Sequence, residues 1–258
     1  MNANKEKHMK RIRCVGATIV AIIIFSGPSA KCPAYGSDAR VLRRTSNDKD
    51  HYLAVLNVGT NVDSIAYISR KSMFINGAIR EESRQRVIQS RSQEIMRVEN
   101  VVFDVNGVEG ERLIMIYDAG AGYYVQGKKR ARVVLDECVR MRDDLVRQIP
   151  PERQINRFEY VKVQAPVLAG GDIEVFAKYD LVKTPGLWTS VWVDKRIGME
   201  VLSVVYSEMG MLSLTELQVI AVNKPVDRAT IYSGLEGIEN QNLPELSLVE
   251  FLDGGDGS

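Results

Sequence analysis

The chain has 258 residues, of which 45% are hydrophobic and 26% charged, as is usual for a globular protein with a packed core. This length fits one large all-β domain or two small ones. The first 36 residues hold six Lys or Arg and one acid, so residues 37–258 carry a net charge of −4. A mildly acidic chain lacks the basic surface that nucleic-acid binding needs, and we expect no nucleic-acid partner.

The N-terminal segment is typical of a secretory signal peptide. Basic residues between Lys5 and Arg13 precede an apolar run from Cys14 to Phe25, and Ala34-Tyr35-Gly36 fits a cleavage site. The apolar run is about a dozen residues long, whereas a spanning helix needs roughly 20. We therefore predict a signal peptide over residues 1–36 and an exported protein that is soluble after cleavage. An uncleaved anchor is the alternative.

The three cysteines leave two alternatives open. If cleavage follows Gly36, Cys138 is a lone thiol packed in a helix. If cleavage follows Ala30, Cys32 and Cys138 could form a disulfide in an oxidising compartment.

The next part of the chain predicts a β-rich domain over residues 50–232. Residues 37–49 are polar and predict a flexible linker, and residues 50–58 predict a short helix. Apolar and polar residues then partly alternate, which predicts about six strands between Ser64 and Leu135. Asn76-Gly77, between the first two strands, is a strong hairpin signal.

A helix interrupts the strands. Residues 136–147 have helix-compatible apolar spacing and end before Pro150-Pro151. Further strands follow, and the clearest pattern is a meander of three strands over 189–222, with turns at Asp194–Gly198 and Ser207–Gly210. Residues 233–258 hold six acids and no Lys or Arg, which predicts a largely disordered acidic tail. A docked helix or a partner-binding motif within residues 243–252 is the alternative.

This order of elements predicts a mainly β fold of about ten antiparallel strands. A strongly curved antiparallel sheet or an unclosed β-barrel with a helical lid would satisfy it.

The sequence contains no recognisable catalytic or metal-binding constellation. Once the signal peptide is removed, His51 is the single histidine, and no His/Cys cluster has the spacing of metal ligands. Residues 122–128 match the start of a phosphate-binding loop, but Lys129 stands where Ser or Thr should hold Mg²⁺. We therefore predict that the protein is not an enzyme and has no catalytic residues, metal or cofactor.

Large adaptable side chains recur on separate predicted strands. Met and aromatic residues suit irregular apolar ligands, so we predict that they line a cavity; the alternative is that they fill the core between sheet and helix. These residues are Met96, Leu113, Met115, Tyr117, Tyr123, Trp192 and Tyr206.

Several short motifs occur in a familiar order. Met96-Arg97-Val98-Glu99 and Ile114–Asp118 lead to Gly122-Tyr123-Tyr124, and after the helix come Trp192–Lys195, Gly198, Tyr206 and Gly210. Over residues 50–232 this layout resembles the LolA-like superfamily of periplasmic lipoprotein carriers, which also includes the RseB-type stress regulators.

The resemblance implies an unclosed β-barrel whose helical lid, residues 136–148, covers a hydrophobic cavity for acyl chains. Arg97 would be a polar latch at that cavity. The implied function is a non-catalytic, monomeric carrier of lipid or lipoprotein acyl chains, of the outer-membrane lipoprotein-sorting type, with a membrane-bound donor or acceptor protein as partner. The alternative is an envelope-stress regulatory protein on the same fold, which would form a stable protein complex.

Overall fold

The computed structural model describes residues 48–146, 155–163, 172–180, 187–207 and 209–253. The predicted signal peptide and most of the predicted linker lie outside these residues. None of the helices that it describes is long and apolar enough to cross a bilayer.

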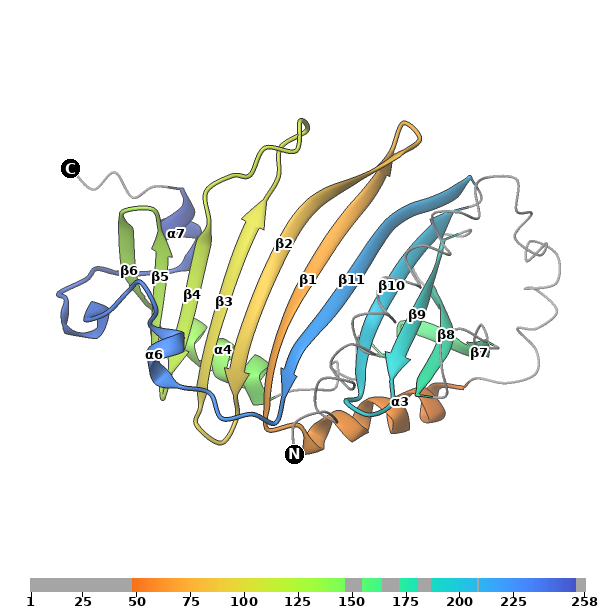
Figure 1. The fold of residues 1–258 in the computed structure, drawn as a ribbon, viewed down its shortest axis with the longest axis horizontal. Helices are drawn as coiled ribbons and strands as arrows, with labels where there is room; N and C mark the ends of the chain where they lie inside the picture. Colours follow the sequence, from red (N-terminus) through yellow and green to blue (C-terminus); the bar gives the residue numbers. More distant parts are fainter. Residues whose placement is uncertain (1–47, 147–154, 164–171, 181–186, 208, 254–258) are drawn as a thin grey trace, which may run out of the picture. The chain divides into compact units, whose positions relative to one another are not determined.

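Twelve strands dominate the described part of the chain. They hydrogen-bond in the order β12-β6-β5-β4-β3-β2-β1-β11-β10-β9-β8-β7, and the two ends of this order do not pair, so the sheet stays open (Figure 1). The strands are β1 (Ser64–Ile75), β2 (Ala78–Ser90), β3 (Ile95–Val102), β4 (Leu113–Asp118), β5 (Ala121–Gln126), β6 (Lys129–Val133), β7 (Phe158–Val163), β8 (Ile173–Asp180), β9 (Trp188–Asp194), β10 (Met199–Ser207), β11 (Gly210–Val222) and β12 (Glu245–Leu246).

The prediction of a mainly β, unclosed antiparallel sheet is confirmed, with one exception. The short strand β12 pairs parallel with β6. The predicted hairpin joins β1 to β2, and both Asn76 (φ 52°) and Gly77 (φ 80°) have the positive φ that a two-residue type I′ turn requires. Gly198 and Gly210, in the predicted meander, also have positive φ.

The chain divides into two compact units, each built from separate stretches of sequence. Unit 1 comprises residues 1–61, 71–80 and 149–218, and unit 2 comprises residues 62–70, 81–148 and 219–258. The described helices are α3 (Lys49–Asn57), η1 (Val58–Asn61), α4 (Leu135–Val146), α6 (Arg228–Ile231), η3 (Ile238–Asn240) and α7 (Leu248–Leu252).

In unit 1, helix α3 covers one face of the strands β7 to β9. Tyr52 and Leu56 of α3 are buried against Tyr160, Phe176 and Val191. The Tyr52 and Tyr160 rings stack with centroids 4.5 Å apart. This helix was predicted over residues 50–58 and is found within one residue of that range.

In unit 2, both faces of the sheet are covered. Helix α4, predicted as the lid, packs Leu145 against side chains of β2 to β4 such as Val87 and Val98. On the opposite face, Ile231 and Ile238 from the C-terminal part of the chain pack in a second cluster.

The structure differs from the predicted disordered tail in the acidic C-terminal segment, where residues 233–253 are ordered. Within residues 233–253, Leu235, Ile238 and Phe251 are buried, and Ser247 and Glu250 form a capping box that starts α7. These apolar residues dock on unit 2 although the surrounding composition is acidic. The alternative of a docked helix within residues 243–252 describes α7 better.

Candidate functional site

The side chains between α4 and the sheet of unit 2 form an apolar layer, which we call the α4-covered layer. It contains Tyr67, Val87, Met96, Val98, Met115, Tyr117, Met141 and Leu145. Strand register explains why they meet: Met96 lies opposite Tyr117, and Met115 lies opposite Val98. Such cross-strand neighbours share a face of the sheet.

Three of the eight side chains in this layer are methionines. A methionine side chain is unbranched and polarizable, so it refills irregular space at little cost. Met115 and Met141 are only partly buried, whereas Leu145 and Tyr117 are almost fully enclosed. Burial also raises the pKa of Tyr117, which keeps this phenol neutral and the layer apolar.

The N-terminal end of α4 is attached to unit 2 by polar contacts. Glu137 Oε2 accepts hydrogen bonds from Tyr124 Oη at 2.7 Å and from the Leu248 backbone N–H at 2.9 Å. Burial and the hydrogen bond to Glu137 raise the pKa of Tyr124. The helix is therefore fixed near Glu137, while Leu145, toward its other end, is held by apolar packing.

Close packing under the start of α4 depends on Gly122. A Cβ at this position would lie 2.8 Å from Val133 Cβ and 2.9 Å from Cys138 Sγ. Cys138 is buried, it forms no disulfide within the described part of the chain, and burial raises the pKa of its thiol. The possible pairing partner Cys32 lies outside the described residues, so the predicted alternatives for Cys138 stay open.

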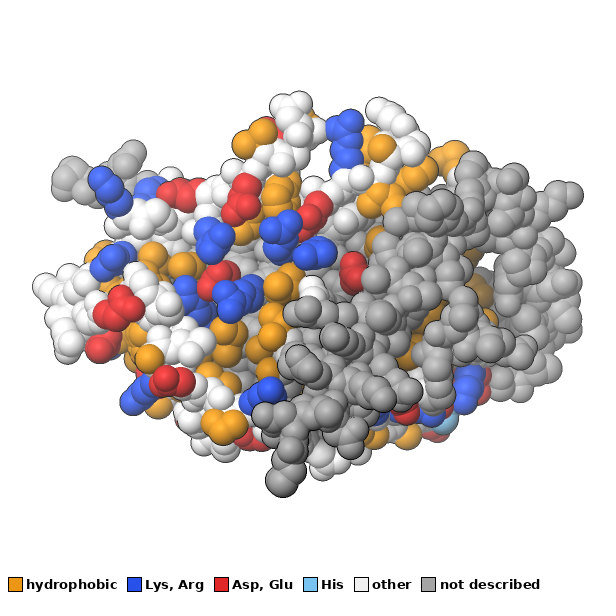
Figure 2. Space-filling view, in the orientation of Figure 1, with side chains coloured by type: hydrophobic (Ala, Val, Ile, Leu, Met, Phe, Trp, Pro, Cys, Tyr) orange, Lys and Arg blue, Asp and Glu red, His pale blue; other side chains and the backbone are white. Residues whose placement is uncertain are grey.

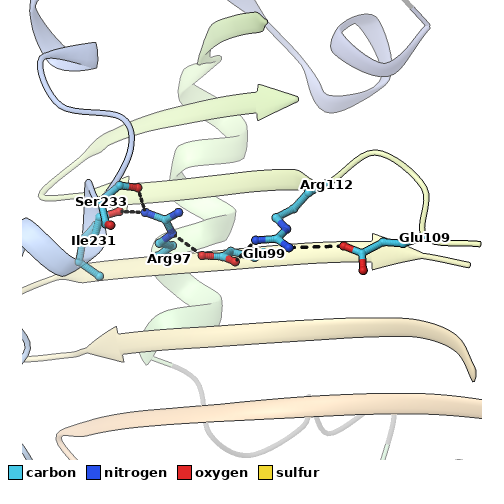
Figure 3. A network of polar contacts seen from close by, with 6 residues as sticks. All are labelled: Arg97, Glu99, Glu109, Arg112, Ile231 and Ser233. Atoms are coloured by element: carbon cyan, nitrogen blue, oxygen red, sulfur yellow. Dashed lines mark hydrogen bonds and ion pairs between the residues drawn. The ribbon is translucent and has the colours of Figure 1, made fainter. Parts of the chain in front are cut away.

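The opposite face of β3 carries a network of charges (Figure 3). The buried Arg97 donates from Nη1 to the carbonyl oxygens of Ile231 and Ser233, each at 2.8 Å, and from Nε to Glu99 Oε1 at 2.8 Å. Glu99 also accepts from Arg112, which is half exposed. Arg97 thus links β3 to the C-terminal segment, and Figure 3 shows α4 on the far side of the sheet.

The predicted cavity residues therefore fall into three groups. Met96, Met115 and Tyr117 lie in the α4-covered layer, and Leu113 packs beside it with Tyr124 and Cys138. Arg97 and Tyr123 lie on the opposite face of unit 2. Trp192 and Tyr206 belong to unit 1, in a cluster with Val175, Leu202 and Val204. A lining role for these residues stays a prediction.

Sequence reasoning missed the residues that α4 contributes. Met141 and Leu145 lie in the helix that the apolar spacing predicts but were not predicted to belong to the site, although their spacing of four places them on one helix face. Glu137 carries no local signal, because its partners Tyr124 and Leu248 come from distant parts of the chain.

Unit 1 holds a charged cluster that sequence reasoning also missed. His51 Nε2 lies 2.6 Å from Glu174 Oε2, and Lys162 Nζ lies 3.3 Å from the same oxygen. Burial acts to raise the pKa of Glu174, but the hydrogen bonds and charges of His51 and Lys162 outweigh it and lower that pKa. Among the residues that the structure describes, no group of three His, Cys, Asp or Glu could hold a metal ion.

A half-open cleft of about 220 Å³ lies in unit 2 between the ends of β1, β2 and β11 and the start of α6. Ala66, Ile88 and Val226 form its apolar floor, and Arg86 and Lys224 also line it. Figure 2 shows acidic and basic side chains intermingled over the middle of unit 2 on the face toward the viewer. The cleft is smaller than the roughly 300–1,000 Å³ of typical small-molecule sites.

We compared the chain with known protein families, curated proteins and solved structures, and found similarity to several solved structures. No family model and no curated protein matches the chain. The chain is similar to MucB (16% identity, TM-score 0.47, covering 74% of this chain and 64% of MucB). It is also similar to LprF from Mycobacterium bovis (9%, 0.38, covering 70% and 96%) and to a LolA superfamily protein from Nitrosomonas europaea (11%, 0.29, covering 70% and 97%). The chain thus spans less than two thirds of MucB.

Proposed function

We propose that the protein is a non-catalytic periplasmic binding protein that holds the acyl chains of lipid or lipoprotein in the α4-covered layer. The observation that carries this proposal is the methionine-rich layer beneath a single helix that is fixed by polar contacts near one end. Met96, Met115 and Met141 supply the adaptable surface, and α4 supplies the cover.

Ligand entry would require α4 to lift from the sheet at the Leu145 end. Leu145 contacts apolar side chains, and an acyl chain offers contacts of the same kind in its place, so the exchange costs little free energy. The hydrogen bonds of Glu137 would keep the other end of α4 attached as a hinge. In this proposal the layer is filled by protein side chains when no ligand is bound.

The first test is native mass spectrometry of the protein recovered from the compartment to which it is exported. The proposal expects co-purifying lipid or lipoprotein that is lost on mild organic extraction. The same spectrum gives the N-terminus and so tests cleavage after Gly36. A bare protein mass together with a stable protein partner would favour the regulatory alternative.

The second test places matched substitutions on the two faces of β4. Met115→Gln puts an amide in the α4-covered layer, where leaving it unpaired costs about 1–3 kcal/mol, so binding of a fluorescent fatty acid should weaken about 5- to 150-fold. Ile114→Gln makes a similar change on the opposite face and should leave binding unchanged. Equal effects of the two substitutions would contradict the proposed site.

A further inference from the structure

We propose that unit 1 docks on an anionic lipid surface through the ends of two neighbouring hairpins. The surface, which we call the apolar tip, consists of Met73, Phe74, Ile75, Ile79, Met209 and Leu212, all of them exposed. It is separate from the α4-covered layer, so this inference does not depend on the proposed function.

The end of β1 is exposed on both of its faces. Successive side chains in a strand point to opposite faces, so a strand with one buried face exposes every second residue. Met73, Phe74 and Ile75 are consecutive, yet their exposed fractions are 36%, 43% and 42%. Side chains on both faces of this apolar segment are therefore partly exposed.

The turn between β10 and β11 adds to the same surface. β11 neighbours β1 in the sheet, and the Asn223 backbone N–H donates to the Ser64 carbonyl oxygen at 2.7 Å, so the end of β11 lies beside the start of β1. The start of β11 must then lie near the end of β1, in the β1–β2 hairpin. This start carries Leu212 and is preceded by Met209, whose exposed fraction is 95%.

Basic residues next to the apolar tip favour an anionic lipid surface as its partner. Residues 70–80 contain Arg70, Lys71 and Arg80 and no acid, and Glu81 and Glu82 follow directly on β2, so residues 70–82 carry a net charge of +1. Glu208, outside the described residues, is the one acid in the neighbouring turn. Figure 2 shows basic side chains beside the hydrophobic ones at the β1–β2 hairpin. Each basic residue near an anionic bilayer contributes about 1 kcal/mol of attraction.

The spacing along β1 fits the depth of a membrane interface. Lys71 precedes Met73 by two residues, which is about 7 Å along a strand. Interfacial segments bury their apolar side chains about 5–10 Å deep, which would leave the basic residues at the level of the lipid headgroups. The backbone of the hairpin is paired within the sheet, so shallow insertion leaves few polar groups without partners.

The loop between β3 and β4 offers a matched control. Val105 and Val108 are more exposed than every residue of the apolar tip except Met209, but Asp104 and Glu109 flank them. This loop, residues 103–112, holds three acids and one Arg, so it combines apolar side chains with a net negative charge. If hydrophobicity alone caused binding, both surfaces would bind vesicles.

The test uses the exported protein with Phe74→Trp or, as control, Val105→Trp, mixed with phosphatidylcholine vesicles that contain or lack phosphatidylglycerol. The proposal expects a blue shift of tryptophan emission and quenching by brominated lipid for Phe74→Trp alone, and only with phosphatidylglycerol. Phe74→Ser with Ile75→Ser should weaken vesicle co-sedimentation at least about tenfold.

Two outcomes would overturn the inference. One is equal emission changes, or none, in the two tryptophan variants. The other is a concentration-dependent dimer that the double serine variant abolishes while vesicle binding is absent, which would make the apolar tip a self-association surface. Circular dichroism of all variants confirms that these exposed substitutions leave the fold intact.

Discussion

Removing the Arg97 side chain should destabilise unit 2 and release the C-terminal segment. In Arg97→Ala, the carbonyl oxygens of Ile231 and Ser233 lose their donor, and the buried Glu99 carboxylate keeps only the longer contact with Arg112. Both consequences follow from one guanidinium group that makes three hydrogen bonds of 2.8 Å.

The expected loss of stability is large for a single substitution. Breaking a buried ion pair by removing one partner costs about 3–5 kcal/mol, because the other charge stays buried. With a urea m-value of about 2 kcal/mol/M, a loss of 4 kcal/mol moves the unfolding midpoint by about 2 M. Arg112→Ala is the control, since an ion pair with a half-exposed arginine is worth about 0–1 kcal/mol.

The assay should follow the two units separately. Labelling of the buried Cys138 thiol reports on unit 2, whereas Trp188 and Trp192 both lie in unit 1. Arg97→Met combined with Glu99→Met should cost less than Arg97→Ala, because no buried charge is left without its partner. The reasoning is refuted if Arg97→Ala and Arg112→Ala shift the Cys138 transition equally.

Two further substitutions test the attachment of α4 and the charge cluster of unit 1. Gly122→Ala forces a Cβ to within 2.9 Å of Cys138 Sγ, so we expect a loss of about 1–3 kcal/mol in thermal unfolding and, through displacement of α4, faster Cys138 labelling; an unchanged melting temperature would argue against close packing here. The lowered pKa of Glu174 means that its ionised form, paired with His51 and Lys162, stabilises the fold above the ordinary pKa of 4.5, and that this contribution disappears as the pH falls. Glu174→Gln should therefore reduce the free energy of unfolding at pH 7 and flatten its decline in acid, and denaturant titrations across this range that superimpose on those of the unmodified protein would exclude this contribution.

Local signals predicted most of the fold. The alternation of side chains and the Asn76-Gly77 turn depend on a few adjacent residues, and both describe β1 and β2 correctly. The apolar spacing of α4 placed that helix within one residue at each end. These signals can be recognised in the sequence because each depends on interactions between residues that are close together in the chain.

The candidate site was predicted only in part. Met96 and Arg97 are adjacent on β3, and adjacent side chains of a strand point to opposite faces, so Met96 lies in the α4-covered layer and Arg97 on the opposite face. That the two side chains lie on opposite faces could be predicted from the sequence. Which segment packs on each face of β3 could not be predicted from the sequence. Arg97, for example, donates to the carbonyl oxygen of Ile231, which lies 134 positions away in the chain.

Composition misled the prediction for the C-terminal segment. Six acids without a basic residue are typical of disorder, yet Leu235, Ile238 and Phe251 are enough to bury the segment against unit 2. Whether a segment with few apolar residues docks depends on the apolar surface that is available to it in the fold. That surface is created by strands elsewhere in the chain.

Unit 2 is assembled from separate stretches of the sequence, and this has a consequence for its synthesis. Its final stretch, residues 219–258, supplies Ile231 and Ile238 to one cluster and Phe251 to another. A nascent chain that is still emerging has β2 to β5 with one face bare, and unit 2 can be completed only after Phe251 is available. Premature termination before Val219 would leave this apolar face open to proteases and aggregation, whereas a chain that crosses a membrane unfolded would complete unit 2 at the end of its passage.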